Sequence, residues 1–295
     1  MVRYTSFMGL VKAYIISFKE DKRWRALLAE RFANTGLEIV FVDAVRGSAL
    51  DELEKAPFRD NRRQHKSPYI LKDNVVGCAL SHYKAWQMLI DSGDGYGFVF
   101  ENDAMPLSDD ISAALTRLSE MADQLDIVSL ANRRPTFKRE KIAVCSENTA
   151  LYALRGNDIG AEAYFINSDA AQRLLNHRNR YEYEVDFLIH HWWMHDCQIL
   201  HLMPPLFAED GRASSIGYSE TEIWEKDSLM HKISRRVHRL IDSFQKRYRF
   251  SGYLNNIRNR VSPFWTYIAA AHSFFGGAKV FTLLNKQLVR TRAFY

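Results

Sequence analysis

Three polar residues directly follow a short apolar run near the middle of the chain. The run, residues 98–100 (FVF), is typical of a buried strand, and Glu101, Asn102 and Asp103 come after it. Open α/β sheets bind their ligands at the carboxyl ends of the strands. Carboxylate and amide oxygens at such a position can coordinate a hard divalent cation that also contacts phosphate oxygens. The triplet therefore predicts a cation site beside a phosphate-bearing ligand.

A second group of side chains that could bind a metal lies at residues 190–195 (HHWWMH). His191 and His195 have the i, i+4 spacing that can bind zinc on a helix. The zinc-protease pattern also needs a glutamate between its histidines, and here the intervening residues are Trp, Trp and Met. We therefore expect a packed aromatic helix at this point and no metal.

The segment before the acidic triplet predicts a helix that leads into it. Ala79, Tyr83, Trp86 and Ile90 recur every three or four residues, which indicates an amphipathic helix from about residue 78 to residue 90. Residues 92–95 (SGDG) are typical of a turn and end this helix.

The remaining pattern alternates between strands and helices. We expect strands at residues 11–18, 37–42, 126–130, 161–166 and 197–202. We expect helices at residues 24–32, 111–121 and 169–176, the second of them capped by Ser108 or Asp109. Residues 48–73 show no clear periodicity and predict a loop or a short helix. This order of elements favours an α/β sheet.

The acidic triplet and the helix before it carry a resemblance to a known family. Residues 77–82 (GCALSH), the Trp-bearing helix, the apolar strand and the triplet together resemble glycosyltransferase family 25. That family includes bacterial lipooligosaccharide galactosyl- and glucosyltransferases and the collagen galactosyltransferases. The resemblance covers about residues 11–220. It implies a GT-A-like, Rossmann-like mixed sheet flanked by helices as one domain, residues 1–228.

The resemblance also implies which residues form the site. Asp103 would hold Mn²⁺ or Mg²⁺, aided by Glu101 or Asn102. Asp186 would be the general base, with Glu184 or Asp210 as substitutes. The residues implied to bind the nucleotide sugar are Ile16, Ser17, Arg23, Asp43, Ala44, Ser81, His82, Glu101 and Asn102.

Several of these positions have a structural alternative. Asp43 also fits a turn residue at a strand end, and His82 also fits a helix-start residue bonded to the backbone. Arg133, Arg134 and residues 214–216 (SSI) are candidates to face the diphosphate. Arg62 and Arg63 are either a solvated face or a contact for a phosphorylated acceptor.

The function implied by the resemblance is hexose transfer. Galactose or glucose would move from a UDP-sugar to a sugar of a lipooligosaccharide core, with inversion at the anomeric carbon. The family's usual triplet is Glu-Asp-Asp, and Asn102 departs from it. Two other functions therefore stay open: a member that binds sugar nucleotide or glycan without turnover, and a transferase that needs no metal.

Length and cysteine content set the general class. The 295 residues suffice for a substantial core and one or two domains. Cys78, Cys145 and Cys197 show neither metal-binding nor paired spacing, which favours a reducing, cytoplasmic compartment. The apolar positions of the first 18 residues are too interrupted for a secretory signal.

The charge balance changes sharply near residue 231. Residues 231–295 carry 13 Lys and Arg against one acid, Asp242, a balance of +12, whereas residues 1–230 carry 27 against 34, a balance of −7. Residues 231–250 have apolar positions on one face and basic positions on the other, which predicts a basic amphipathic helix. We therefore separate residues 229–295 as a basic helical extension.

We expect this extension to attach to anionic lipid at the inner face of the inner membrane. Residues 261–278 are uncharged, but Pro263, His272, Gly276 and Gly277 interrupt them, which favours attachment at the interface over a membrane span. The alternatives are a helical hairpin packed on the domain, an arm that forms a homodimer and a nucleic-acid patch. The last is disfavoured, because no nucleic-acid-binding module accompanies the charge.

Overall fold

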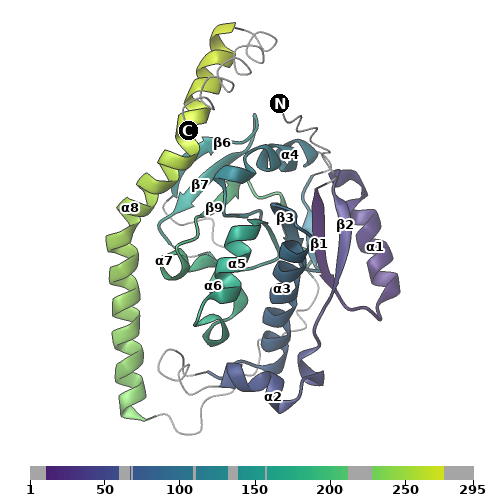
Figure 1. The fold of residues 1–295 in the computed structure, drawn as a ribbon, viewed down its shortest axis with the longest axis vertical. Helices are drawn as coiled ribbons and strands as arrows, with labels where there is room; N and C mark the ends of the chain where they lie inside the picture. The colour runs from purple at the N-terminus through teal and green to yellow at the C-terminus, as the bar shows by residue number, and fades with distance from the viewer. Residues whose placement is uncertain are drawn as a thin grey trace, which may run out of the picture.

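The computed structural model describes residues 11–59, 67, 69–108, 111–131, 139–156, 158–211 and 228–275, with side chains described as far as Val261. In these residues a mixed eight-stranded sheet lies between helices on both faces (Figure 1). The long helix α8 (Leu229–Phe275) runs along one side of the molecule (Figure 1).

The first three long strands form a parallel group. β1 (Lys12–Ser17) lies between β2 (Glu38–Asp43) and β3 (Tyr96–Phe100), so the strand order reverses at β1. The helices α1 (Lys22–Phe32) and α3 (Asp73–Asp91) join these strands and bury their apolar residues in different core clusters, on opposite faces of the sheet. This arrangement creates a crevice at the carboxyl ends of the strands, where open α/β sheets bind ligands.

The second half of the sheet is mixed. β8 pairs antiparallel with both β3 and β5, and the order continues through β9 and β7 to β6 at the edge. The strands are β5 (Ile127–Ser129), β6 (Arg139–Val144), β7 (Ala150–Leu154), β8 (Ala163–Asn167) and β9 (Ile199–Met203). A separate ribbon pairs β4 (Ala104–Pro106) with β10 (Phe207–Glu209).

Shorter helices complete the described residues. They are α2 (Glu52–Lys55), α4 (Ser112–Glu120), α5 (Ser168–Asn176), α6 (Val185–His190) and α7 (Trp192–His195). Single 3-10 turns cover Ala33–Thr35, Gly47–Ala49, Ala56–Arg59, Ala122–Gln124 and Arg180–Glu182.

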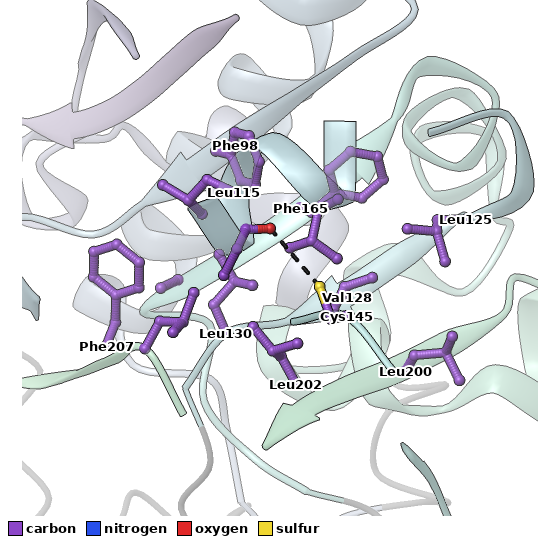
Figure 2. Close-up of a cluster of buried hydrophobic side chains, with 14 of the residues drawn as sticks. Phe98, Leu115, Leu125, Val128, Leu130, Cys145, Phe165, Leu200, Leu202 and Phe207 are labelled. Atoms are coloured by element: carbon purple, nitrogen blue, oxygen red, sulfur yellow. Dashed lines mark hydrogen bonds between the residues drawn. The ribbon is translucent and has the colours of Figure 1, made fainter. Parts of the chain in front are cut away.

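Alternation along the strands divides the core into two clusters. Successive side chains of a strand point to opposite faces of its sheet. Phe98 and Phe165 accordingly belong to the first cluster, whose neighbours include Leu130 and Phe207 (Figure 2). Tyr164 of β8 belongs to the second cluster, together with buried residues of α3. The alternation therefore places the Tyr164 side chain beneath α3.

The central turns of α8 belong to the core. Leu254, Ile257 and Val261 are buried in the first cluster. The Tyr253 ring stacks on Trp192 with centroids 3.9 Å apart. Its hydroxyl donates to the carbonyl of Ile199 at 2.8 Å and accepts from the N–H of the same residue at 2.9 Å. None of the helices in the described ranges has both the length and the apolar character needed to cross a membrane.

The expected α/β architecture is confirmed. Each strand expected from the sequence corresponds to an observed one, and the helices expected at residues 24–32, 78–90, 169–176 and 231–250 are present as α1, α3, α5 and part of α8. The sequence does not predict β6 and β7. β6 (REKIAV) is an edge strand with few buried positions, and β7 (ALYAL) is rich in Ala and Leu rather than β-branched residues.

Two local expectations are wrong. α4 begins after Ile111 with no side-chain cap, so Ser108 does not cap it, and Asp109 lies outside the described residues. The aromatic segment is packed as expected, but it forms two short helices instead of one. His191 separates them with φ −91° and ψ 57°, so it does not share a helix face with His195.

A contact between two backbone segments fixes the loop after β2. A Cβ atom on Gly77 of α3 would lie 2.6 Å from the carbonyl oxygen of Val45 and from the nitrogen of Gly47. A Cβ atom on Gly47 would lie 1.7 Å from the carbonyl oxygen of Asp73. Backbone atoms cannot rotate away as a side chain can, so glycine is required at both positions.

We expect Gly77→Ala to lower the free energy of unfolding by roughly 1–3 kcal/mol, because the loop must move to admit the methyl group. Urea denaturation measures this change. Gly252→Ala is the matched control, since a Cβ at Gly252 on α8 meets nothing within 4 Å and should be stabilising by about 0.5–1 kcal/mol. Equal stability of Gly77→Ala and the wild type would contradict the contact.

Candidate functional site

A pocket of about 360 Å³ opens where β1, β2 and β3 end, against the first half of α3. Its lining consists of Ile16, Ser17, Phe18, Ala44, Val45, Arg46, Gly47, Ser48, Asn74, Cys78, Ser81, His82, Glu101 and Asn102. Seven of these are residues that the sequence predicts at a nucleotide-sugar site: Ile16, Ser17, Ala44, Ser81, His82, Glu101 and Asn102. The crevice of the sheet and most of the predicted binding residues therefore coincide.

The spacing of residues 77–82 has a structural explanation. Ser81 Oγ donates to the carbonyl of Gly77 at 2.7 Å and accepts from the N–H of Val45 at 2.8 Å. Gly77 and Ser81, one helical turn apart, therefore hold the loop after β2. Cys78 and His82 each follow one of these residues and line the pocket. Gly77 and Ser81 therefore fix the loop that forms one wall, while Cys78 and His82 add their side chains to the lining.

His82 is held between the core and the pocket. The Trp86 Nε1–H donates to the Tyr164 hydroxyl at 2.7 Å, and that hydroxyl lies 2.8 Å from His82 Nδ1. His82 Nε2 lies 3.1 Å from Glu101 Oε1. Because a carboxylate can only accept, Nε2 is the nitrogen that donates to Glu101, and in the neutral tautomer Nδ1 then accepts from Tyr164. His82 lies inside α3 and contacts side chains, so it is not a helix-start residue bonded to the backbone.

The acidic triplet forms a turn between β3 and β4. The N–H of Glu101 donates to the carbonyl of Glu162 at 2.8 Å, and the carbonyl of Glu101 accepts from Ala104 at 3.1 Å. Glu101 and Asn102 line the pocket, whereas Asp103 is absent from the lining. The carbonyl of Asp103 accepts from the N–H of Asp210, at the end of β10. The turn thereby brings a second acidic segment next to Asp103.

Asp103 carries a carboxylate in an unfavourable environment. Burial, followed by the negative charges of Glu101, Glu209 and Asp210, raises the pKa of Asp103 to about 6, although a backbone hydrogen bond acts in the opposite direction. Its buried Oδ1 finds no hydrogen-bond donor within the described residues. A divalent cation would relieve both the repulsion and the missing partner, so these residues fit the cation that the sequence predicts.

A second donor set lies within the pocket. Cys78, His82 and Glu101 place one ligand atom each within 4.8 Å of the others. Burial, followed by the charges of Glu101, Asp186 and Asp103, raises the pKa of the Cys78 thiol well above its usual range. Metals bind the thiolate, so the oxygen donors of the acidic turn are the better site for a hard cation.

Asp186 stands at the start of α6 with its carboxylate fixed by the backbone. Oδ1 accepts from the N–H of Phe187 at 2.7 Å, and Oδ2 accepts from the N–H of Gly160 at 3.2 Å. Gly160 has a φ of 97°, a conformation that favours glycine. Asp186 does not line the pocket, but its charge acts on the pocket residue Cys78. Of the two substitutes, Asp210 pairs with Arg31 at 3.3 Å, and its side chain is only 6% exposed.

Asp43 and Arg23 do not line the pocket. Arg25 binds Asp43 at 2.7 Å and the carbonyl of Ser17 at 2.7 Å, and this hydrogen bond holds the pKa of the Asp43 carboxyl below its usual value. Arg23 is exposed on α1. Arg25 precedes the buried Leu28 by three residues and therefore shares its face. This helical spacing could have identified Arg25 as the residue that ties the ends of β1 and β2 together.

Seven lining residues are not among the predicted site residues: Phe18, Val45, Arg46, Gly47, Ser48, Asn74 and Cys78. Arg46 lies at the rim, with its guanidinium 4.1 Å from the ring centroid of Phe18 and 2.5 Å from the carboxylate of Glu20. Asn74 comes from the first turn of α3. Neither belongs to a recognisable motif, and only the folded loop brings them to the pocket. Several other candidates lie outside the described residues, namely Arg62, Arg63, Arg133, Arg134 and residues 214–216.

Comparison with known proteins gives one family. The sequence model described as Glycosyltransferase family 25 (LPS biosynthesis protein) matches residues 10–189. This range includes β1, β2, β3, α3, the acidic turn and Asp186, which are the elements of the pocket and the acids around it.

Individual relatives are distant in sequence. A Haemophilus influenzae protein named "Putative glycosyltransferase" is 26% identical over 203 residues, which cover 67% of this chain and 70% of the relative. Human procollagen galactosyltransferase 2 is 25% identical over 181 residues, 59% of this chain and 28% of the relative. The mouse protein named "Inactive glycosyltransferase 25 family member 3" is 28% identical over 178 residues, 58% of this chain and 29% of the relative. The chain thus matches less than a third of the length of the two mammalian proteins.

We expect nitrogen NMR shifts of His82 to show the Nε2–H tautomer in the wild type. Tyr164→Phe should keep this tautomer, because Glu101 still accepts from Nε2, but it should lower the free energy of unfolding by about 1–3 kcal/mol, because Trp86 Nε1 and His82 Nδ1 lose their buried partner. Tyr96→Phe is the control, since Tyr96 lies on the other core cluster. An Nδ1–H tautomer in the wild type would contradict the hydrogen-bond order.

We expect Asp103→Asn to stabilise the metal-free protein by roughly 1–3 kcal/mol at pH 7.5, because it removes a buried, repelled charge. The folded-state pKa is raised to about 6, so the carboxylate destabilises the fold above that pH and the gain should vanish below pH 4. Mn²⁺ should raise the melting temperature of the wild type and not that of the variant. A variant that is less stable than the metal-free wild type, or that still responds to Mn²⁺, would refute the site.

Proposed function

The chain belongs to glycosyltransferase family 25, and from that premise we propose that it transfers galactose or glucose from a UDP-sugar to a sugar of a lipooligosaccharide core. The observation that carries the proposal is the pocket at the ends of β1, β2 and β3, which gathers Ser17, His82 and Glu101. The family description, an LPS biosynthesis protein, supports the acceptor. The name of procollagen galactosyltransferase 2 supports galactose as the sugar.

The pocket offers groups suited to a nucleotide sugar. Ser17 Oγ is buried at the end of β1, lines the pocket and has no hydrogen-bond partner among the described residues. A ribose hydroxyl or a base edge would satisfy it. Arg46 at the rim would supply positive charge to a diphosphate. His82, oriented by Tyr164, would donate through Nε2 either to Glu101 or to the bound donor.

The proposed transfer is a single displacement with inversion. The acceptor hydroxyl oxygen forms the new bond to the anomeric carbon while the bond to the UDP oxygen breaks. Asp186 takes the proton of that hydroxyl as the bond forms. The backbone N–H groups of Gly160 and Phe187 support this role, because they hold the carboxylate in one orientation. Glu184 remains the alternative base, and Asp210 is less available because it pairs with Arg31.

The cation belongs to the same proposal. Asp103, with Glu101 or Asn102, would hold Mn²⁺ or Mg²⁺, which supplies charge neutralisation for the departing diphosphate. Oδ1 of Asp103 supports this assignment, because it is buried and has no hydrogen-bond partner among the described residues.

A second candidate function is binding without turnover. Asn102 stands where a carboxylate would add to the acidic turn, and two rodent relatives carry the word "inactive" in their names. A metal-independent transferase is a third candidate for the same reason. Release of UDP from UDP-galactose and UDP-glucose, measured with Mn²⁺ and with a chelator, separates the three. No release indicates a binding protein, and release that resists the chelator indicates a metal-independent enzyme.

We expect Asp186→Asn to lower the turnover number by roughly 100-fold or more, because a positioned general base contributes about 10²–10⁴-fold. The Michaelis constant for the donor should change little, since the base acts on the acceptor. Asp123→Asn is the matched control, because Asp123 is an exposed carboxylate that does not line the pocket.

Two outcomes would exclude Asp186 as the general base. Wild-type turnover in Asp186→Asn would transfer the role to Glu184, which the corresponding Glu184→Gln variant then tests. A weaker donor affinity with unchanged turnover would instead place Asp186 in donor binding.

A further inference from the structure

The first half of α8 exposes an apolar surface that the rest of the described chain does not cover. Eight of its large apolar side chains have exposed fractions between 43% and 76%: Leu229, Met230, Ile233, Val237, Leu240, Ile241, Phe244 and Tyr248. Elsewhere in the described residues such side chains are scattered over several elements, as Leu27 and Val144 illustrate. Scattered exposure is ordinary, whereas a continuous apolar patch marks an interaction surface. We call these eight residues the apolar stripe.

The stripe points away from the protein. Arg235 is buried in the same half of the helix, and Tyr253 packs against Trp192 in the docked part. These two residues lie on one line of the helix, because 18 residues make about five turns at 3.6 residues per turn. Phe244 is nine residues from each of them, about two and a half turns, so it lies on the opposite side. The helix thus docks with one face and presents the stripe on the other.

Positive charge accompanies the stripe. Lys232, Arg236, Arg239 and Arg247 are exposed on the same turns of α8, and Asp242 is the only acid in the sequence from residue 229 to the end. Long basic side chains beside an apolar face can reach the phosphate level of a bilayer while the apolar face enters the acyl boundary. An apolar stripe beside basic side chains is the composition of a helix that lies at a membrane interface.

We propose that the apolar stripe of α8 docks on an anionic phospholipid bilayer. The central turns of the helix remain fixed to the core through Leu254, Ile257 and Val261, so the bilayer holds the whole protein and not a loose tail. Apolar burial and attraction of the basic flank to anionic headgroups act together in this contact.

The geometry gives the docking a consequence for the pocket. The start of α8 lies at the same end of the molecule as α2 and the first turn of α3 (Figure 1), and the first half of α3 lines the pocket. A bilayer bound to the apolar stripe holds the protein, and with it the pocket, on the membrane that would present a lipid-linked acceptor. This consequence rests on the proposed function, whereas the docking itself does not.

The charge of the helix disfavours a second copy as the occupant. Two stripes packed together would bring the arginines of both helices close, with only Asp242 on each helix to offset them. Like charges that flank a helix pair destabilise it. An anionic bilayer reverses this effect, because each basic residue then gains attraction.

The experiment is co-sedimentation of the full chain with phosphatidylcholine vesicles, with and without phosphatidylglycerol. We expect strong binding only to the anionic vesicles, weakened by salt. Leu240→Glu/Phe244→Glu should lose roughly 100-fold in binding, because two buried apolar groups are replaced by charges that the bilayer repels. Lys232→Gln/Arg236→Gln/Arg247→Gln should also lose roughly 100-fold, since each basic residue near an anionic surface contributes about fivefold.

Leu27→Glu/Val144→Glu is the matched control, because it makes the same change at exposed apolar positions outside α8, and it should bind like the wild type. Equal binding to neutral and anionic vesicles, or wild-type binding by Leu240→Glu/Phe244→Glu, overturns the proposal. A wild-type dimer in solution that the Leu240→Glu/Phe244→Glu variant dissociates also overturns it, in favour of a second copy. Release of UDP without vesicles, measured on the same proteins, should be unchanged and tests the proposed function separately.

Discussion

The close approach of the loop after β2 to α3 is the contact on which the pocket depends. Gly47 and Gly77 bring two backbones together at distances that exclude any side chain, and Ser81 ties the loop to the helix through the N–H of Val45. This contact places the loop residues along one wall of the pocket and leaves Cys78 and His82 on the other. Packing this tight leaves no space for a side chain at either glycine, so the wall depends on this contact.

Some buried polar groups of the site have hydrogen-bond partners within the protein, and others have none among the described residues. This difference distinguishes side chains that support the structure from those available to a ligand. The chain of hydrogen bonds from Trp86 through Tyr164 to His82 is complete and ends at Glu101. Ser17 Oγ and Asp103 Oδ1, by contrast, are buried without a partner in the described residues. Buried polar atoms that lack partners cost stability. Ser17 lines the pocket and Asp103 directly follows two lining residues, so a bound ligand or cation could supply both partners, whereas other such atoms, as in Gln124 and Gln198, lie away from the pocket.

α8 connects the core to the molecular surface with one continuous helix. Its central turns bury Leu254, Ile257 and Val261, while its first turns leave Leu240 and Phe244 exposed. The two parts of α8 differ because the helix extends beyond the edge of the sheet against which its central turns pack. Because the centre of α8 is fixed in the core, a surface that binds the exposed half of the helix also sets the orientation of the whole protein. The sequence-based division at residue 229 therefore marks a change in charge. The packing of α8 against the core nevertheless joins the residues before and after this position.

The sequence by itself determined the α/β class, most strands and helices, and the ends of the strands as the place for chemistry, because apolar periodicity and strand-end polar residues are local signals. It predicted Ser81, His82 and Glu101 at one pocket. From the sequence we predicted Arg23, although the spacing of Arg25 from Leu28 already indicated that Arg25 shares the packed face of α1 and can reach Asp43. Nothing in the sequence indicated the partnership of Tyr164 with His82, or of Glu209 and Asp210 with Asp103. Those contacts join residues about 80 to 110 positions apart, and only the strand pairing that brings β8 and β10 beside β3 and β4 creates them.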